Sequence, residues 1–175
     1  PAIPSFMGKL ADVQGRATRL HLAKWLTDVE NGSGGLTARV FVNRLWYLFF
    51  GEGISRSLDD FGGQGVAPDH PFLLDRLAVE FYGAQWDIKH MVKLLVMSRA
   101  YRQSSVAYGD AIKHDPLNRF FSRQSRYRLP AEMIRDNALA VGGLLVLDYG
   151  GGSSKPFQPP GYYRHLNFPQ RKYKQ

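Results

Sequence analysis

LTARVFVNRLWYLFF, residues 36–50, is the stretch of sequence that decides the fold. It contains no proline or glycine, which predicts an α-helix of about four turns. Gly51 follows it, at the place where a left-handed C-terminal cap usually lies. Its polar side chains are Thr37, Arg39, Asn43 and Arg44. A helix that is apolar nearly all the way round is expected to lie buried at the centre of a bundle.

Arg39 and Asn43 are one helical turn apart, so they project from the same side of this central helix. A guanidinium buried without partners costs several kcal/mol, which predicts that a carboxylate or several carbonyl oxygens meet Arg39. The glycine-rich loop at residues 51–68 contains two carboxylates, Asp59 and Asp60. These aspartates are suited to pairing with Arg39 or Arg44, and we expect one of them to neutralise the buried arginine of the central helix.

The rest of the sequence predicts more helices and no strand. Helical periodicity or helix-start residues mark 16–28, a helix that begins at Pro71, 87–98 and 130–145. The loop at 51–68 has five glycines and no helical period. The predicted fold class is therefore all-α, an irregular bundle of about five main helices around the central helix.

Local signals refine two of these segments. Asp87 is a typical N-cap residue for the helix at 87–98, which we expect to extend toward Tyr101. Asp115 followed by Pro116 predicts a further helix start within the mixed stretch 104–129.

The length of 175 residues suits one domain, and a hydrophobic content of 44% indicates a packed core. Residues 1–15, with two prolines and two glycines, predict an extended lead-in to a helical domain at 16–149. Residues 150–175 predict an irregular basic, aromatic tail. The absence of cysteine excludes disulfides, thiolate metal sites and haem attachment within this segment.

The net charge of +8 is concentrated near the C-terminus. The last 27 residues carry five bases and no acid, so the first 148 hold 18 bases against 15 acids, a net charge of +3. This distribution argues against a basic platform for nucleic acid on the helical domain. No window has the roughly 20 apolar residues needed to span a bilayer, and no signal peptide is visible.

Several segments together resemble a known family. They are RLHLAKWLTD at 19–28, LTARVFVNRLW at 36–46, FGEGISRSLDDFGGQG at 50–65, HPFLLDRLAVEF at 70–81, YRQSS at 101–105, RLPAEMIRDNALAVGGLL at 128–145 and KPFQPPGYYRHLNFPQRKY at 155–173. Their order and spacing are similar to the planctomycete-type C-terminal domain called domain of unknown function 1553.

This resemblance implies a cellular location and a set of neighbouring domains more than it implies a reaction. It implies a secreted or periplasmic bacterial protein in which this domain follows another uncharacterised domain and often accompanies a c-type cytochrome domain. Any haem c would then lie in a neighbouring domain, with no cofactor in this segment. The resemblance implies no established reaction, and it implies that the domain continues beyond Gln175.

Three carboxylates are candidates for catalysis. Asp60 lies on the flexible backbone of the glycine-rich loop, and Glu132 and Asp136 are one turn apart on the helix at 130–145. Carboxylates at this spacing share a face and can act together as acid and base. The more common role of such residues is in salt-bridge networks, and we weigh that role as the stronger.

The candidate ligand-binding residues are Arg39, Asn43, Arg44, Asp59, Arg102, Arg128 and Arg135. Arginine binds carboxylate, sulfate or phosphate with a planar two-pronged fork, so a convergent cluster suits a uronate or a sulfated sugar. The alternative, which we favour, is that arginines and carboxylates join the helices and the long loop to one another. The five histidines form no HxH or HExxH pair, so no metal site is predicted.

Three functions follow from these observations. The first is a structural or ligand-binding helical module whose partners are other domains of the same polypeptide. The second is part of an enzyme that acts oxidatively or hydrolytically on an acidic or sulfated carbohydrate. The third and weakest is non-specific nucleic-acid binding through the basic tail.

Overall fold

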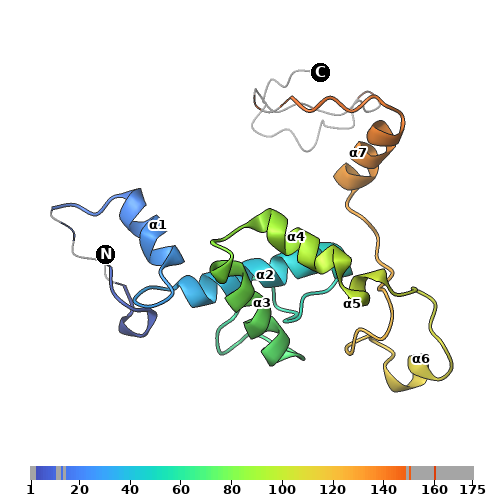
Figure 1. Cartoon of the computed structure of the whole chain (residues 1–175), viewed down its shortest axis with the longest axis horizontal. Coiled ribbons are helices and arrows are strands. Elements are labelled where there is room, and N and C mark those ends of the chain that lie inside the picture. Colours follow the sequence, from blue (N-terminus) through green and yellow to red (C-terminus); the bar gives the residue numbers. More distant parts are fainter. Residues whose placement is uncertain (1–2, 11–12, 14, 149, 151–159, 161–175) are drawn as a thin grey trace. The chain divides into compact units, whose positions relative to one another are not determined.

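The computed structural model describes residues 3–10, 13, 15–148, 150 and 160, and over these residues the protein is helical with no strand. This confirms the all-α class. The element order is η1 (Ser5–Met7), α1 (Arg19–Thr27), α2 (Gly34–Phe50), α3 (Pro71–Gly83), α4 (Ile88–Met97), α5 (Arg99–Arg102), α6 (Ala111–His114) and α7 (Ala131–Val141), as Figure 1 shows. The chain divides into two compact units, residues 1–127 and 128–175. The predicted domain boundaries stay predictions.

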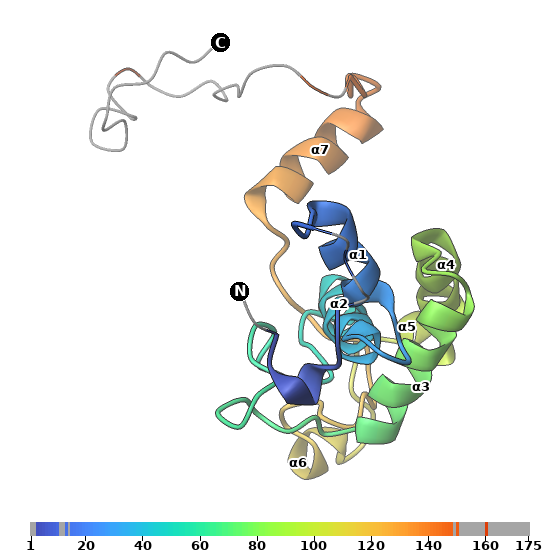
Figure 2. The same cartoon turned by 90° about the vertical axis from the view of Figure 1, so that its left-hand side faces the viewer.

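The first unit is built around α2, which contacts α1, α3 and α4. Figures 1 and 2 both show α3 and α4 beside α2. The core contains Val42, Trp46 and Phe50 of α2, and aromatic stacking joins Trp46 to Phe50 with ring centroids 3.9 Å apart. Gly51 adopts a left-handed φ of 80° and donates its backbone N–H to the Tyr47 carbonyl oxygen, which confirms the predicted C-terminal cap.

The expectation that α2 is buried all the way round is wrong. Leu36, Tyr47 and Leu48 are exposed within the described part of the chain. The buried side chains follow one broad face, because α3, α4 and the loop after α2 cover that face.

Helices α3 and α4 complete the core through regular apolar positions. Pro71 is the first residue of α3, where its fixed φ fits and its missing N–H has no consequence. Asp87 caps α4 as predicted, because its carboxylate accepts the backbone N–H groups of Lys89 (2.8 Å) and His90 (3.1 Å). The buried side chains of the two helices are Leu74, Leu77, Ala78, Phe81, Met91 and Leu95.

The chain changes direction at Ser98, so α4 does not extend to Tyr101 as a single helix. Ser98 has a ψ of 151° and separates α4 from the short α5. Its hydroxyl oxygen accepts the backbone N–H of Tyr101 at 3.1 Å. A capping hydroxyl that favours extended backbone explains why the helical pattern stops and restarts here.

The glycine-rich loop after α2 has no helix or strand, as predicted, and one contact fixes it to α2. The Asn43 side chain donates to the Ser55 carbonyl oxygen at 2.8 Å and accepts the Ser55 N–H at 2.9 Å. Gly53 lies so close to this amide that a Cβ would be 2.8 Å from Asn43 Nδ2. The loop therefore approaches the helix closely at this position because glycine stands there.

Helix α1 and the turn after it precede α2 in the chain, and α1 contacts α2. Trp25 donates its indole N–H to the Met7 carbonyl oxygen at 3.1 Å. Asp28 accepts the N–H groups of Glu30 (2.9 Å) and Asn31 (3.0 Å), which forms the turn toward α2. The hydrogen bond from Asn31, and then that from Glu30, lowers the pKa of Asp28 below its ordinary value.

The segment after α5 departs from the prediction at Asp115. Asp115 ends α6 and does not start a helix, and its carboxylate accepts the N–H groups of Arg119 (2.7 Å) and Phe120 (2.9 Å). This arrangement forms a turn, which is the common alternative for an aspartate before a proline.

At the end of the unit Tyr127 donates to the Leu48 carbonyl oxygen at 2.9 Å, and burial raises the pKa of Tyr127.

The second unit contains α7, which is shorter than the predicted 130–145 helix because Gly142 follows Val141 as its cap. Apart from residues 150 and 160, the predicted tail lies outside the described residues. None of the helices that the structure describes is both long and apolar enough to cross a membrane.

Candidate functional site

The predicted arginines of α2 each meet a separate carboxylate. Arg39 donates to Asp75 of α3 at 2.6 Å, and Arg44 contacts Asp59 of the glycine-rich loop. The loop aspartate Asp59 thus pairs with Arg44, whereas Arg39, the arginine predicted to be buried and neutralised by the loop, pairs with Asp75, so that prediction is wrong for Arg39. The Arg39 side chain is 42% exposed and not buried, and its partner lies on α3 instead of the glycine-rich loop. Both pairs join neighbouring elements at the surface.

Asn43 has a structural role in this unit. Its side chain is fully buried, and both ends of its amide bond the Ser55 backbone. A buried amide with satisfied donor and acceptor holds the loop to the helix and leaves no free group directed at a ligand.

Asp60 and Arg102 lie apart from these pairs. The Asp60 carboxylate accepts the N–H of Gly62 at 2.7 Å, which forms a local turn in the loop. Arg102 lines a shallow hollow with Arg99 and Gln103.

The remaining predicted residues belong to the second unit. Arg135 donates to its neighbour Asp136 at 3.1 Å, Glu132 lies in the first turn of α7, and Arg128 precedes that helix. The structure therefore brings together Arg44 with Asp59 and Arg135 with Asp136. Convergence of all these residues on one ligand, and catalysis by Asp60, Glu132 and Asp136, stay predictions.

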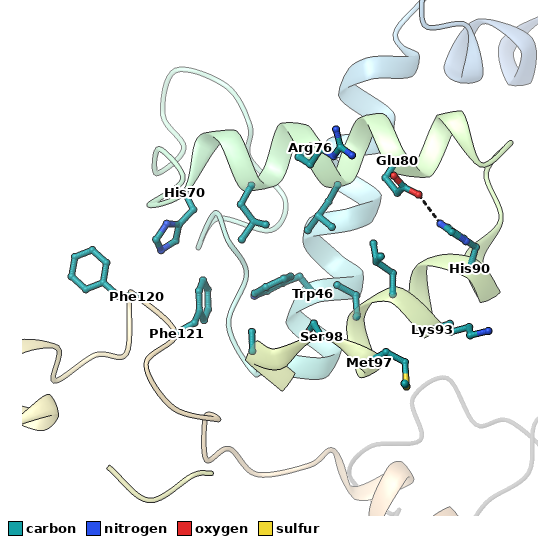
Figure 3. A pocket seen from close by; sticks show the side chains of 15 residues that line it. Trp46, His70, Arg76, Glu80, His90, Lys93, Met97, Ser98, Phe120 and Phe121 are labelled. Carbon is teal, nitrogen blue, oxygen red and sulfur yellow. Dashed lines mark hydrogen bonds and ion pairs between the residues drawn. The ribbon is translucent and has the colours of Figure 1, made fainter. Parts of the chain in front are cut away.

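A larger feature of the first unit is an open cleft of about 1060 Å³. It lies between α3 on one side and α4 with α5 on the other, with Trp46 of α2 at its base (Figure 3). The segment after α6 closes one end. Its lining residues are Trp46, His70, Leu73, Arg76, Leu77, Glu80, His90, Lys93, Leu94, Leu95, Met97, Ser98, Ala100, Phe120 and Phe121.

The base of the cleft is apolar and well packed. Trp46, Leu77 and Leu95 are buried core residues that also line it. Phe121 packs its ring edge against Trp46 with centroids 5.0 Å apart. The Trp46 indole nitrogen is buried and has no hydrogen-bond partner among the described residues. This base offers dispersion contacts and desolvation to an apolar group.

Polar side chains lie toward the two ends of the cleft. Figure 3 shows His70 with Phe120 and Phe121 at one end and the Glu80–His90 contact at the other. Glu80 and His90 are 2.8 Å apart, and His70 Nε2 lies 2.8 Å from the Arg119 carbonyl oxygen.

The aromatic end of the cleft is held by backbone contacts. Asp115 fixes the turn before Phe120, and Gln103 donates to the Phe121 carbonyl oxygen at 2.5 Å. Phe121 has a φ of 49°, which is unusual for a bulky residue. This conformation places its ring 5.5 Å from that of His70 and against Trp46.

Sequence reasoning did not find this cleft. In the sequence His70 and His90 belong to no HxH or HExxH pair, and Arg76 and Lys93 belong to none of the predicted site residues. Glu80 lies near the end of α3 and His90 near the start of α4, and a short turn joins the two helices. Their contact could therefore have been predicted from their positions in the sequence. Phe120 and Phe121 reach the cleft because of the path that a long irregular segment takes. No local sequence pattern predicts that path.

The described residues contain no group of three or more His, Asp or Glu side chains arranged to hold a metal ion. A family model described as protein of unknown function, DUF1553, matches residues 18–175. The chain belongs to the DUF1553 family. No curated protein matches this chain. No solved structure matches it either.

Proposed function

We propose that this DUF1553 chain is a binding module and that the cleft between α3 and α4–α5 is where it holds its ligand. The observation that supports this most strongly is the apolar base of the cleft together with the exposed apolar side chains at its edge. Trp46, Leu77 and Leu95 form a buried base, while Met97 and Phe120 at the edge are 60% and 71% exposed. Apolar side chains gathered around a concave site are typical of interaction surfaces.

The ion pairs of this unit have a structural role under this proposal. Arg39–Asp75 and Arg44–Asp59 each join α2 to a neighbouring element, and their carboxylates are occupied by those arginines. Binding of an acidic or sulfated sugar by the arginines remains a separate proposal, to be tested by titration with such sugars.

A neutral apolar dye, N-phenyl-1-naphthylamine, tests the proposed site. We expect its fluorescence to rise on binding to the chain and its affinity to fall at least about tenfold in the double variant Leu94→Gln/Met97→Gln. Glutamine keeps the length and helix propensity of these side chains and removes their apolar character. Ile88→Gln is the matched control, because Ile88 is an exposed residue of α4 outside the cleft. Equal dye affinity in all three folded proteins would overturn the proposal.

We also propose, from the family resemblance, that the module works in a periplasmic or extracellular bacterial protein beside a c-type cytochrome domain. Fractionation of the native host tests the location, and haem staining of the full-length protein tests the association. Recovery of a haem-free full-length protein from the cytoplasm would contradict this proposal.

A further inference from the structure

We infer that the natural occupant of the cleft is an acidic amphipathic helix from a partner protein or domain. This inference rests on the proposed function, since it requires the cleft to be the binding site. Three properties of the described residues support it: the shape of the cleft, the spacing of its exposed apolar side chains and its uncompensated positive charge.

The cleft has the shape of a groove between helices. Its walls are α3, with 13 residues, and α4, with 10 residues, so they are about 20 Å and 15 Å long at 1.5 Å per residue. The volume of about 1060 Å³ lies just above the range of roughly 300–1,000 Å³ for small-molecule pockets. A segment of two to three helical turns suits these dimensions and corresponds to the helix-in-groove mode of recognition.

Two exposed apolar side chains of α4 that line the cleft have helical spacing. Leu94 and Met97 are three residues apart, so they lie on one face of α4 beside the groove, and both are exposed. Phe120 adds an exposed ring at the end of the groove, on the segment after α6. A small ligand at the base would leave these side chains in water, whereas the apolar face of a helix would cover them.

The charge of the cleft specifies an acidic partner. Arg76 and Lys93 line it, and the described residues provide no ion-pair partner for either. Glu80, the carboxylate that lines the cleft, is in contact with His90. Asp75, next to Arg76 in sequence, binds Arg39. An occupant with carboxylates flanking its apolar face would satisfy both cations.

Two synthetic peptides of about fourteen residues test the inference. Both carry leucine along one helical face, and the flanking positions are glutamate in one and lysine in the other. Fluorescence anisotropy of labelled peptides measures their affinity for the whole 175-residue chain. We expect the glutamate peptide to bind at least about tenfold more tightly than the lysine peptide, with an affinity that falls as salt rises.

Charge-reversal variants assign the binding to the cleft. In Arg76→Glu/Lys93→Glu we expect the glutamate peptide to lose at least about tenfold in affinity and the lysine peptide to gain. The matched control is Arg19→Glu/Lys89→Glu, which changes the same charge on exposed residues of α1 and α4 outside the cleft. Equal losses in the two double variants would overturn the inference, because they would reflect net charge alone.

The dye separates this inference from the proposed function. If the dye binds the cleft but the two peptides bind equally or not at all, the acidic helix is wrong while the binding site stands. If dodecanoate displaces the dye and the glutamate peptide does not, the occupant is a small anionic amphiphile and the helix inference is overturned. If neither dye nor peptide responds to the cleft variants, both proposals fail.

Discussion

Helices α1 and α2 follow one another in the chain and contact each other, yet they differ in burial. Helix α2 has seven buried residues, whereas α1 has none. Leu20 of α1 is 62% exposed, although it lies in the segment 16–28 that the sequence predicts as a helix of the bundle. The difference follows from the neighbours: α3 and α4 pack on α2, while α1 contacts α2 and the Met7 region. Apolar content shows what a helix is able to bury, and its neighbours determine what it does bury.

The largest expected difference in stability is between two variants, one that truncates an aromatic side chain of α2 and one that truncates a leucine of α1. Phe50→Ala is expected to lower the free energy of unfolding by about 3–5 kcal/mol, because Phe50 is 1% exposed and packs on Trp46 and Tyr101. Leu20→Ala is expected to change it by about 0.5 kcal/mol or less. Urea unfolding followed by circular dichroism measures both. Comparable losses would mean that α1 is as buried in solution as α2.

A second test compares a polar side chain on each helix. Asn43→Ala leaves the Ser55 N–H and carbonyl buried without partners, so we expect a loss of about 1–3 kcal/mol. Thr27→Ala on α1 removes an exposed hydroxyl that bonds the Ala23 carbonyl oxygen, and the expected loss is close to zero. The same unfolding experiment measures both variants. A small effect at Asn43 would show that water replaces the amide at Ser55.

A third test asks how much a surface ion pair contributes to the packing around α2. A double-mutant cycle with Arg39→Ala and Asp75→Ala is expected to give a coupling energy of about 0.2–1 kcal/mol, because the side chains are 42% and 50% exposed. The coupling should shrink in high salt. A coupling well above this range would indicate that a further element covers the pair in the intact protein.

The smallest expected effect is the pH dependence from Asp28, in the turn between the two helices. Its folded-state pKa is lowered, so its contribution to stability is present above the unfolded-state pKa and is lost as the pH falls through the folded-state pKa. Asp28→Asn should therefore lower the free energy of unfolding slightly at neutral pH, and this difference should shrink toward acid pH in urea unfolding at a series of pH values. A difference that grows toward acid pH would contradict this sign.

The features that the sequence predicted correctly have local causes. The left-handed Gly51, Pro71 at the start of α3 and Asp87 at the cap of α4 all act within one or two turns of the chain. The features that it missed depend on contacts between distant segments. Asp75 as the partner of Arg39 requires knowing how α3 lies on α2, and the cleft requires the path of the segment that carries Phe121. Neither relation has a periodic or capping signature.

The five glycines of the loop after α2 differ in how much sequence change they allow. A Cβ at Gly53 would overlap the Ser55 carbonyl oxygen and crowd the Asn43 amide, whereas a Cβ at Gly63 meets nothing within 4 Å. Among relatives that keep the Asn43–Ser55 contact, glycine should therefore persist at position 53 while position 63 varies freely. Gly65 is restricted like Gly53, because its Cβ would overlap the Asp60 carbonyl oxygen, so Gly63 is the glycine of this loop at which a larger residue meets no obstacle.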